Sequence, residues 1–141
     1  MSVEALEKTK SLKVQDVMHK DVVSIDGSAT VAEAVRFMRE RKVSSLLVNR
    51  RNHDDAWGIV TRKDIVSKVV APVGSDNDPN KVRVFEIMTK PVVMVSPGLA
   101  LKYCARLMTQ AGIRRAPVFD GKDIVGIISN TDIFNALDVG K

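Results

Sequence analysis

Two segments of the chain, GIVTRKDI at residues 58–65 and GIISNTDI at residues 126–133, repeat one pattern 68 positions apart. Each begins with a glycine followed by two β-branched residues, which favour a short strand. Each continues with a threonine or serine and, three residues later, an aspartate, a spacing typical of a helix N-terminus. The pattern therefore predicts a strand that runs directly into a helix, once in each half of the chain.

The similarity between the halves extends upstream, where the spacing is 70 rather than 68. The matched pairs there include Val17-Met18 with Ile87-Met88, and Val22-Val23 with Val92-Val93. The spacing changes only where Arg50–Ala56 is matched with Asp120–Asp123, a polar stretch in both halves. Loops tolerate insertions that strands and helices do not, so the two halves are predicted to be structural repeats.

Each half is predicted to fold in the order β-α-β-β-α, which makes the fold class mixed α/β (α+β). Thr30 is placed to cap a helix whose apolar residues at 31, 34, 35 and 38 share one face. Gly112 stands where the matching helix of the second half is expected to end. Asp120-Gly121 predicts a tight turn between strands at 116–119 and 124–128, which match strands at 46–48 and 57–60.

The predicted domain organisation has four segments. An N-terminal extension covers residues 1–13, the repeats cover 14–70 and 84–138, and a linker rich in Pro, Gly, Asp and Asn covers 71–83. Each repeat is so short that a solitary core is marginal, so we expect the two to pack as one module. The extension is compatible with a short helix packed on that module or on a partner.

Composition excludes several classes of protein. Cys104 is the single cysteine, so no internal disulfide is expected, and its place on an apolar helix face indicates a core thiol. His19 and His53 have no ligand spacing, so no metal site is expected. No stretch approaches the roughly 18 apolar residues of a membrane-spanning helix, and no secretory signal precedes the repeats. We therefore expect a cytoplasmic protein without a membrane partner.

The repeated motifs resemble the CBS domain, named after cystathionine β-synthase. The resemblance is carried by the two glycine-to-aspartate segments together with VQDVM (14–18), VFEIM (84–88), VSSLLV (43–48) and IRRAPV (113–118), and it covers roughly residues 10–138. It implies a disc-like module of two pseudo-symmetric repeats with two clefts between them, and frequent homodimers. It also implies a regulatory ligand, AMP, ADP, ATP or S-adenosylmethionine, and no required cofactor.

Thr61 with Asp64, and Ser129 with Asp132, are the predicted ribose-binding residues. A carboxylate accepts hydrogen bonds from both ribose hydroxyls, and in the family that this chain resembles the aspartate holds the ribose. An ordinary capping box, with no ligand, uses the same residue types at the same spacing. The two interpretations are compatible only if the aspartate is not fully engaged by its own backbone.

The resemblance also implies which residues line each cleft. Ser129 and Asp132 are expected to face Met18, Asp21, Val23, Val43, Ser44 and Leu46. Thr61 and Asp64 are expected to face Met88, Pro91, Val93, Ile113, Arg114 and Ala116. Apolar side chains there would enclose an adenine, and the alternative for each of them is plain core packing.

Four basic residues are candidate phosphate ligands: Arg62, Lys63, Arg114 and Arg115. Guanidinium groups match phosphate oxygens well, whereas the alternative role for all four is a solvated surface. Because Ser44-Ser45 and Asn130-Thr131 are neutral, the cleft of Asp64 is predicted to bind phosphate more tightly.

Three kinds of function compete at this point. A ligand-sensing module that regulates an unidentified protein partner is favoured. A net charge of +5 favours anionic partners and makes nucleic-acid binding the second choice. A purely structural scaffold with empty clefts is the third. An enzyme is not expected, because no nucleophile–base pair or phosphate-binding glycine loop is present.

Overall fold

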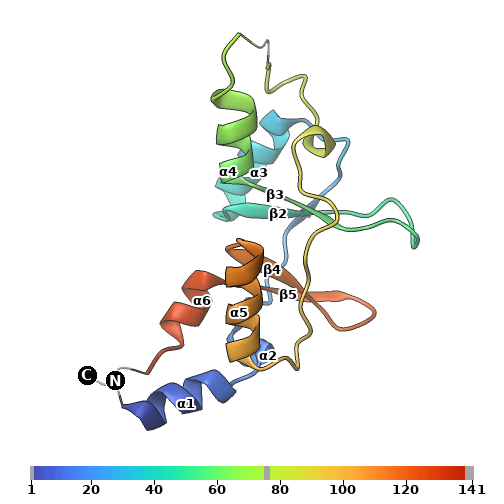
Figure 1. Ribbon diagram of the computed structural model, residues 1–141. Coiled ribbons are helices and arrows are strands. Elements are labelled where there is room, and N and C mark those ends of the chain that lie inside the picture. Colours follow the sequence, from blue (N-terminus) through green and yellow to red (C-terminus); the bar gives the residue numbers. More distant parts are fainter. Residues whose placement is uncertain (1, 75–76, 139–141) are drawn as a thin grey trace. The chain divides into compact units, whose positions relative to one another are not determined.

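The computed structural model describes residues 2–74 and 77–138. These residues form two compact units. The central unit is the continuous stretch Val23–Val92. The terminal unit consists of the residues up to Val22 together with those from Val93 onward. Both units mix helices with short strands, which confirms the predicted fold class (Figure 1).

The central unit is built on a three-stranded sheet. Its strands β1 (Ser24–Ile25), β2 (Ser45–Val48) and β3 (Gly58–Thr61) lie in that order, with β1 parallel to β2 and β2 antiparallel to β3. The helices are α3 (Val31–Arg41), α4 (Arg62–Ile65), the π-helix η1 (Val66–Val70) and the 3₁₀ helix η2 (Val84–Glu86). The apolar face of α3 packs with β2 and β3 into one core.

The terminal unit is built on a β-hairpin. Strands β4 (Arg115–Phe119) and β5 (Ile124–Ser129) pair antiparallel. The helices are α1 (Val3–Ser11), α2 (Val14–Val17), α5 (Leu101–Ala111) and α6 (Asn130–Asn135). Val95 forms a single parallel bridge to Val118, so the extended stretch predicted at 92–95 is shorter than its counterpart β1. Cys104 is fully buried in the core of this unit, as predicted, and burial raises the pKa of its thiol.

Local sequence signals place the helix ends correctly. The Thr30 hydroxyl accepts the backbone N–H of Glu33 at 3.1 Å and caps α3. Gly112 ends α5 in the left-handed conformation, with φ of 66°. Asp120 and Gly121 form the turn between β4 and β5, with Asp120 Oδ1 accepting two backbone N–H groups. The N-terminal extension contains α1, whose Thr9 is buried with its hydroxyl 3.5 Å from the Ala136 carbonyl.

The packing units differ from the sequence repeats. The leading segment of each sequence repeat forms backbone hydrogen bonds with the hairpin of the other repeat and packs with that hairpin. His19 and Ile127 exchange two backbone hydrogen bonds of 2.9 Å. Thr89 and Ile59 make the equivalent pair, at 2.9 and 3.0 Å. The segment before β1 therefore belongs to the terminal unit, and the segment that begins at η2 belongs to the central unit.

At each of these two backbone contacts, a glycine leaves room for the incoming segment. A Cβ added to Gly126 would lie 2.6 Å from Met18 Sδ and 2.7 Å from the His19 carbonyl oxygen. A Cβ added to Gly58 would lie 2.9 Å from Met88 Sδ and 3.2 Å from the Thr89 carbonyl oxygen. The close approach of the His19 backbone thus requires a glycine at 126, whereas at Gly58 the backbone approach is tight and the shortest contact is with the Met88 side chain.

We predict that Gly126→Ala destabilises the protein by about 1–3 kcal/mol, the usual cost of overpacking. Gly98→Ala is the matched control, because nothing lies within 4 Å of a Cβ added at that turn. Urea unfolding of the two variants measures the difference. Equal stability of Gly126→Ala and Gly98→Ala would contradict the proposed steric constraint.

Candidate functional site

The two predicted ribose-binding pairs form identical hydrogen-bonded boxes. Asp64 Oδ2 accepts the backbone N–H of Thr61 at 2.9 Å and its hydroxyl at 3.0 Å, while the Asp64 N–H donates to the Thr61 hydroxyl at 3.1 Å. Ser129 and Asp132 repeat these contacts at 2.8, 2.9 and 3.2 Å. The capping interpretation is therefore confirmed for both pairs, and it uses one oxygen of each carboxylate.

The second oxygen of each carboxylate lies close to a basic side chain, a histidine at Asp132 and a lysine at Asp64. Asp132 Oδ1 lies 2.5 Å from His19 Nε2, and Asp64 Oδ1 lies 3.4 Å from Lys68 Nζ. The Asp132 side chain is 6% exposed, whereas that of His19 is 72% exposed. A buried, doubly anchored carboxylate is thus paired with a side chain that is free to move into water. Lys68 Nζ also donates to the Ile87 carbonyl at 2.8 Å, so the lysine is held at two points, whereas His19 is the more exposed partner.

The terminal unit brings several predicted residues close to Asp132. The segment before β1 packs on the β4–β5 hairpin. This contact puts Met18 against Gly126 and His19 beside the Asp132 carboxylate. Arg115 is the register partner of Ser129 in the β4–β5 ladder, and the Arg114 carbonyl accepts the N–H of Asn130 at 2.9 Å. Arg114 and Arg115 therefore lie at the start of β4, beside the end of β5, where Ser129 leads into α6 and Asp132.

The central unit repeats this arrangement around Asp64. The Ser44 carbonyl accepts the N–H of Arg62 at 3.0 Å, and Ser45 is the register partner of Thr61. A pocket of about 380 Å³ lies beside these residues. It is lined by Met38, Arg39, Lys42, Val43, Ser44 and Arg62. Three cations in this lining make the pocket suitable for an anionic group.

The remaining predicted residues divide between the units. Asp21, Val93, Ile113 and Ala116 lie in the terminal unit, and Val23, Leu46, Lys63, Met88 and Pro91 lie in the central unit. The side chains of Val23, Leu46 and Ala116 are buried in the cores, so packing is their structural role. The crosswise facing of the two repeats that the resemblance implies stays a prediction.

His19 is the residue whose role sequence reasoning missed. The sequence indicated only a surface or pocket-rim position for it. Its contact with Asp132 depends on the exchange of the leading segment, which pairs residues 19 and 127. The available signal was its place directly after Met18, the last residue of a motif at 14–18 that is repeated at 84–88.

Loss of either cap should destabilise the ligand-free protein. We expect Ser129→Ala and Thr61→Ala each to cost about 1 kcal/mol, because each removes the acceptor of a helix N–H and a partner of the carboxylate. Thr131→Ala, on the exposed surface of the same helix as Ser129, is the control and should be close to neutral. Urea unfolding without ligand makes the comparison, and equal stabilities of Ser129→Ala and Thr131→Ala would refute the capping role.

Comparison with known proteins supplies the family context. The model of the CBS domain family matches residues 14–71 and 84–139. An uncharacterized protein of Methanopyrus kandleri is 32% identical over 88% of this chain, which spans 62% of that protein's length. The solved hexameric CBS-CP12 protein from bloom-forming cyanobacteria is 51% identical with a TM-score of 0.82, over 87% of this chain and 69% of that one.

A more distant structure shows the same fold with ligands bound. It is a CBS domain pair in complex with 5′-methylthioadenosine and S-adenosyl-L-methionine, 24% identical with a TM-score of 0.73, over 88% of this chain and 94% of that one. Within the described part of the chain, no helix combines the length and the apolar character needed to cross a membrane.

Proposed function

Because this chain belongs to the CBS domain family, we propose that it is a regulatory module that binds an adenine nucleotide or S-adenosylmethionine. The observation that carries the proposal is the state of the two aspartates. Each is anchored through Oδ2, while Oδ1 contacts an exposed basic side chain, His19 or Lys68. Ribose is a good replacement for that side chain, because its adjacent hydroxyls donate hydrogen bonds to a carboxylate oxygen.

Neighbouring groups suit the other parts of such a ligand. The thioethers of Met18 and Met88 lie beside the glycines that open the two motifs, and a thioether packs well against an aromatic ring such as adenine. Arg114 and Arg115 in the terminal unit, and Arg62 and Lys63 in the central unit, are the proposed phosphate ligands. Both hairpins carry basic residues, so both are proposed to accept phosphate, with the tighter phosphate site still predicted at Asp64.

The proposed action is regulation rather than catalysis. A ligand that binds the folded module stabilises the arrangement it prefers, and a protein partner then responds to that arrangement. The bound complex of the 24%-identical neighbour supports the ligand class, and the hexamer of the CBS-CP12 protein supports self-association, proposed here as a homodimer. A cytoplasmic location is part of the same proposal.

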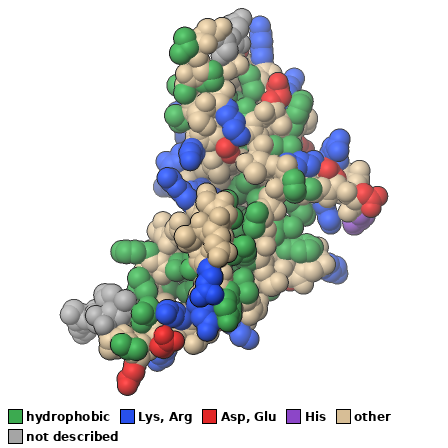
Figure 2. All heavy atoms as spheres, in the orientation of Figure 1, with side chains coloured by type: hydrophobic (Ala, Val, Ile, Leu, Met, Phe, Trp, Pro, Cys, Tyr) green, Lys and Arg blue, Asp and Glu red, His purple; other side chains and the backbone are tan. Residues whose placement is uncertain are grey.

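Nucleic-acid binding is the second candidate, because the net charge is +5. Figure 2 shows Lys and Arg side chains at the surface among apolar and uncharged ones. A continuous basic stripe is the usual footprint of a duplex-binding protein, and its binding weakens steeply with salt.

Thermal unfolding with AMP, ADP, ATP, S-adenosylmethionine, GTP and a short DNA duplex tests the proposal. An adenosyl ligand at about 100 times its Kd should stabilise the protein by about 2.7 kcal/mol, or several degrees in Tm. Asp132→Asn or Asp64→Asn should abolish that shift at its own site, because each loses a charged acceptor. Asp16→Asn is the matched control, since Asp16 caps α2 through the Lys13 N–H and lies at neither ribose site.

The outcomes separate the three functions. A shift with an adenosyl ligand that survives Asp16→Asn, but not one of the ribose-site variants, supports the regulatory site. A shift with DNA alone that weakens steeply with salt favours the nucleic-acid function. No shift with any of these compounds favours the structural scaffold.

Removal of the competing imidazole should tighten ligand binding at Asp132. We expect His19→Gln to lower the Kd by up to about fivefold, the equivalent of an exposed ion pair worth about 1 kcal/mol. His53→Gln, in the exposed loop of the central unit, is the control. Isothermal titration calorimetry measures both variants. Weaker binding by His19→Gln would instead identify His19 as a ligand contact.

A further inference from the structure

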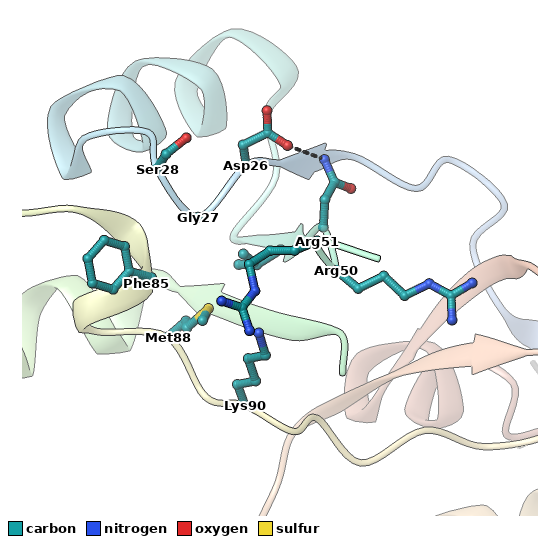
Figure 3. Close-up of a pocket in the computed structure, with 10 residues that line it drawn as sticks. Asp26, Gly27, Ser28, Arg50, Arg51, Phe85, Met88 and Lys90 are labelled. Carbon is teal, nitrogen blue, oxygen red and sulfur yellow. Dashed lines mark hydrogen bonds between the residues drawn. The ribbon is translucent and has the colours of Figure 1, made fainter. Parts of the chain in front are cut away.

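A second pocket, of about 550 Å³, opens on the central unit (Figure 3). Neither Thr61 nor Asp64 lines it, so it does not contain the proposed ribose contacts, but Met88 borders both this pocket and the proposed adenine position. Its volume falls in the range of small-molecule sites. Its lining combines the apolar side chains of Phe85 and Met88 with the cations Arg51 and Lys90.

The apolar wall of this pocket is an exposed aromatic ring. Phe85 follows the first residue of η2 and is 55% exposed, although its backbone N–H is bound to the Gly27 carbonyl at 3.0 Å. Gly27 leaves the pocket open, because a Cβ there would lie 3.3 Å from the Phe85 Cβ. A phenyl ring held by its backbone with one face in water is a preformed surface for an aromatic or apolar group.

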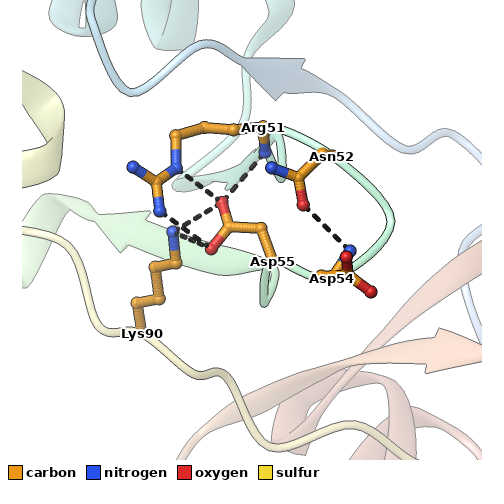
Figure 4. Close-up of polar contacts among 5 residues, drawn as sticks. All are labelled: Arg51, Asn52, Asp54, Asp55 and Lys90. Carbon is orange, nitrogen blue, oxygen red and sulfur yellow. Dashed lines mark hydrogen bonds and ion pairs between the residues drawn. The ribbon is translucent and has the colours of Figure 1, made fainter.

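The cationic wall is held in place by one buried carboxylate. Asp55 Oδ2 accepts the backbone N–H of Arg51 at 2.9 Å and its Nε–H at 3.0 Å, and it lies 2.8 Å from Lys90 Nζ (Figure 4). The hydrogen bonds from Arg51, and then those from Lys90, keep the pKa of Asp55 well below its usual range. Asp55 therefore stays ionised and fixes two cations with a single negative charge. The lining also holds Asp26 and Arg50, whose charges offset each other, so the balance at the pocket stays positive.

The combination of ring and cations belongs to one unit only. At the position equivalent to Phe85, 70 residues earlier, the terminal unit has Gln15. The Arg50–Ala56 loop, which supplies Arg51 and Asp55, corresponds there to the short turn Asp120–Asp123. The first repeat is two residues longer in this region, and its loop helps to form this pocket. The shorter segment of the second repeat only closes a β-hairpin.

We propose that this pocket binds a small aromatic acid, with its ring against Phe85 and Met88 and its acidic group on Arg51 and Lys90. In the view of Figure 3, Met88 lies between these two cations and Phe85, and all four residues line the same pocket. A guanidinium has five N–H donors, of which Asp55 engages those on Nε and Nη2, and a planar acid group is a suitable acceptor for the rest.

The test uses 2-naphthoate as the probe and follows the amide signals of the ¹⁵N-labelled protein by NMR. Saturable shifts are expected at Gly27, Ser28 and Phe85. Neutral naphthalene-2-carboxamide and acetate, which lack the charge and the ring respectively, are each expected to bind at least about tenfold more weakly. 2-Naphthyl phosphate in a parallel titration distinguishes a carboxylate from a phosphate as the preferred acid.

Two variants remove the walls separately. Phe85→Gln installs the residue of the terminal unit, and Arg51→Gln removes one cation; each is expected to raise the Kd about tenfold. Lys90→Gln is a second cation variant in case Arg51→Gln loosens the loop. Lys20→Gln, at the position equivalent to Lys90 in the terminal unit, is the control and should leave the Kd unchanged. The proposal is overturned by unsaturable shifts, by equal binding of the neutral amide, or by variants that bind as the wild type does.

Discussion

The close approach of two backbones at Gly58 and Gly126 is the constraint on which the rest of this structure depends. At each glycine, a strand accepts a segment from the other sequence repeat and exchanges two hydrogen bonds with it. That contact places Met18 and His19 beside the second hairpin, and Met88 and Thr89 beside the first. Without room for the exchanged segment, neither carboxylate would have its present surroundings.

The same frame supports different chemistry in the two units. The carboxylates have identical boxes, but Asp64 contacts a lysine, whereas Asp132 contacts a histidine. One repeat connects its strands through a short turn, and the other through a loop that carries an arginine–aspartate–lysine cluster. The two repeats therefore pack in the same way. Because the side chains at equivalent positions differ, the two units are proposed to bind different groups.

Capping and proposed ligand binding share one side chain without conflict, because a carboxylate has two oxygens. The box takes Oδ2 and orients the group, which lowers the entropy that a ligand would lose by ordering it. Oδ1 is then presented at a fixed position. A structural role for Asp64 and Asp132 is thus a precondition of the proposed binding role rather than an alternative to it.

Local patterns in the sequence determined the repeat, the β-α-β-β-α order of the first half, the cap at Thr30, the helix end at Gly112 and the two boxes; in the second half the first strand is reduced to one bridge at Val95. Each depends on residues a few positions apart, so periodicity and spacing are sufficient. Only the tertiary structure decided the contact of His19 with Asp132, the joining of Arg115 to Ser129, and the pocket beside Phe85. These involve segments distant in the chain, such as residues 19 and 127, and their pairing is set by packing between backbones, which no local pattern specifies.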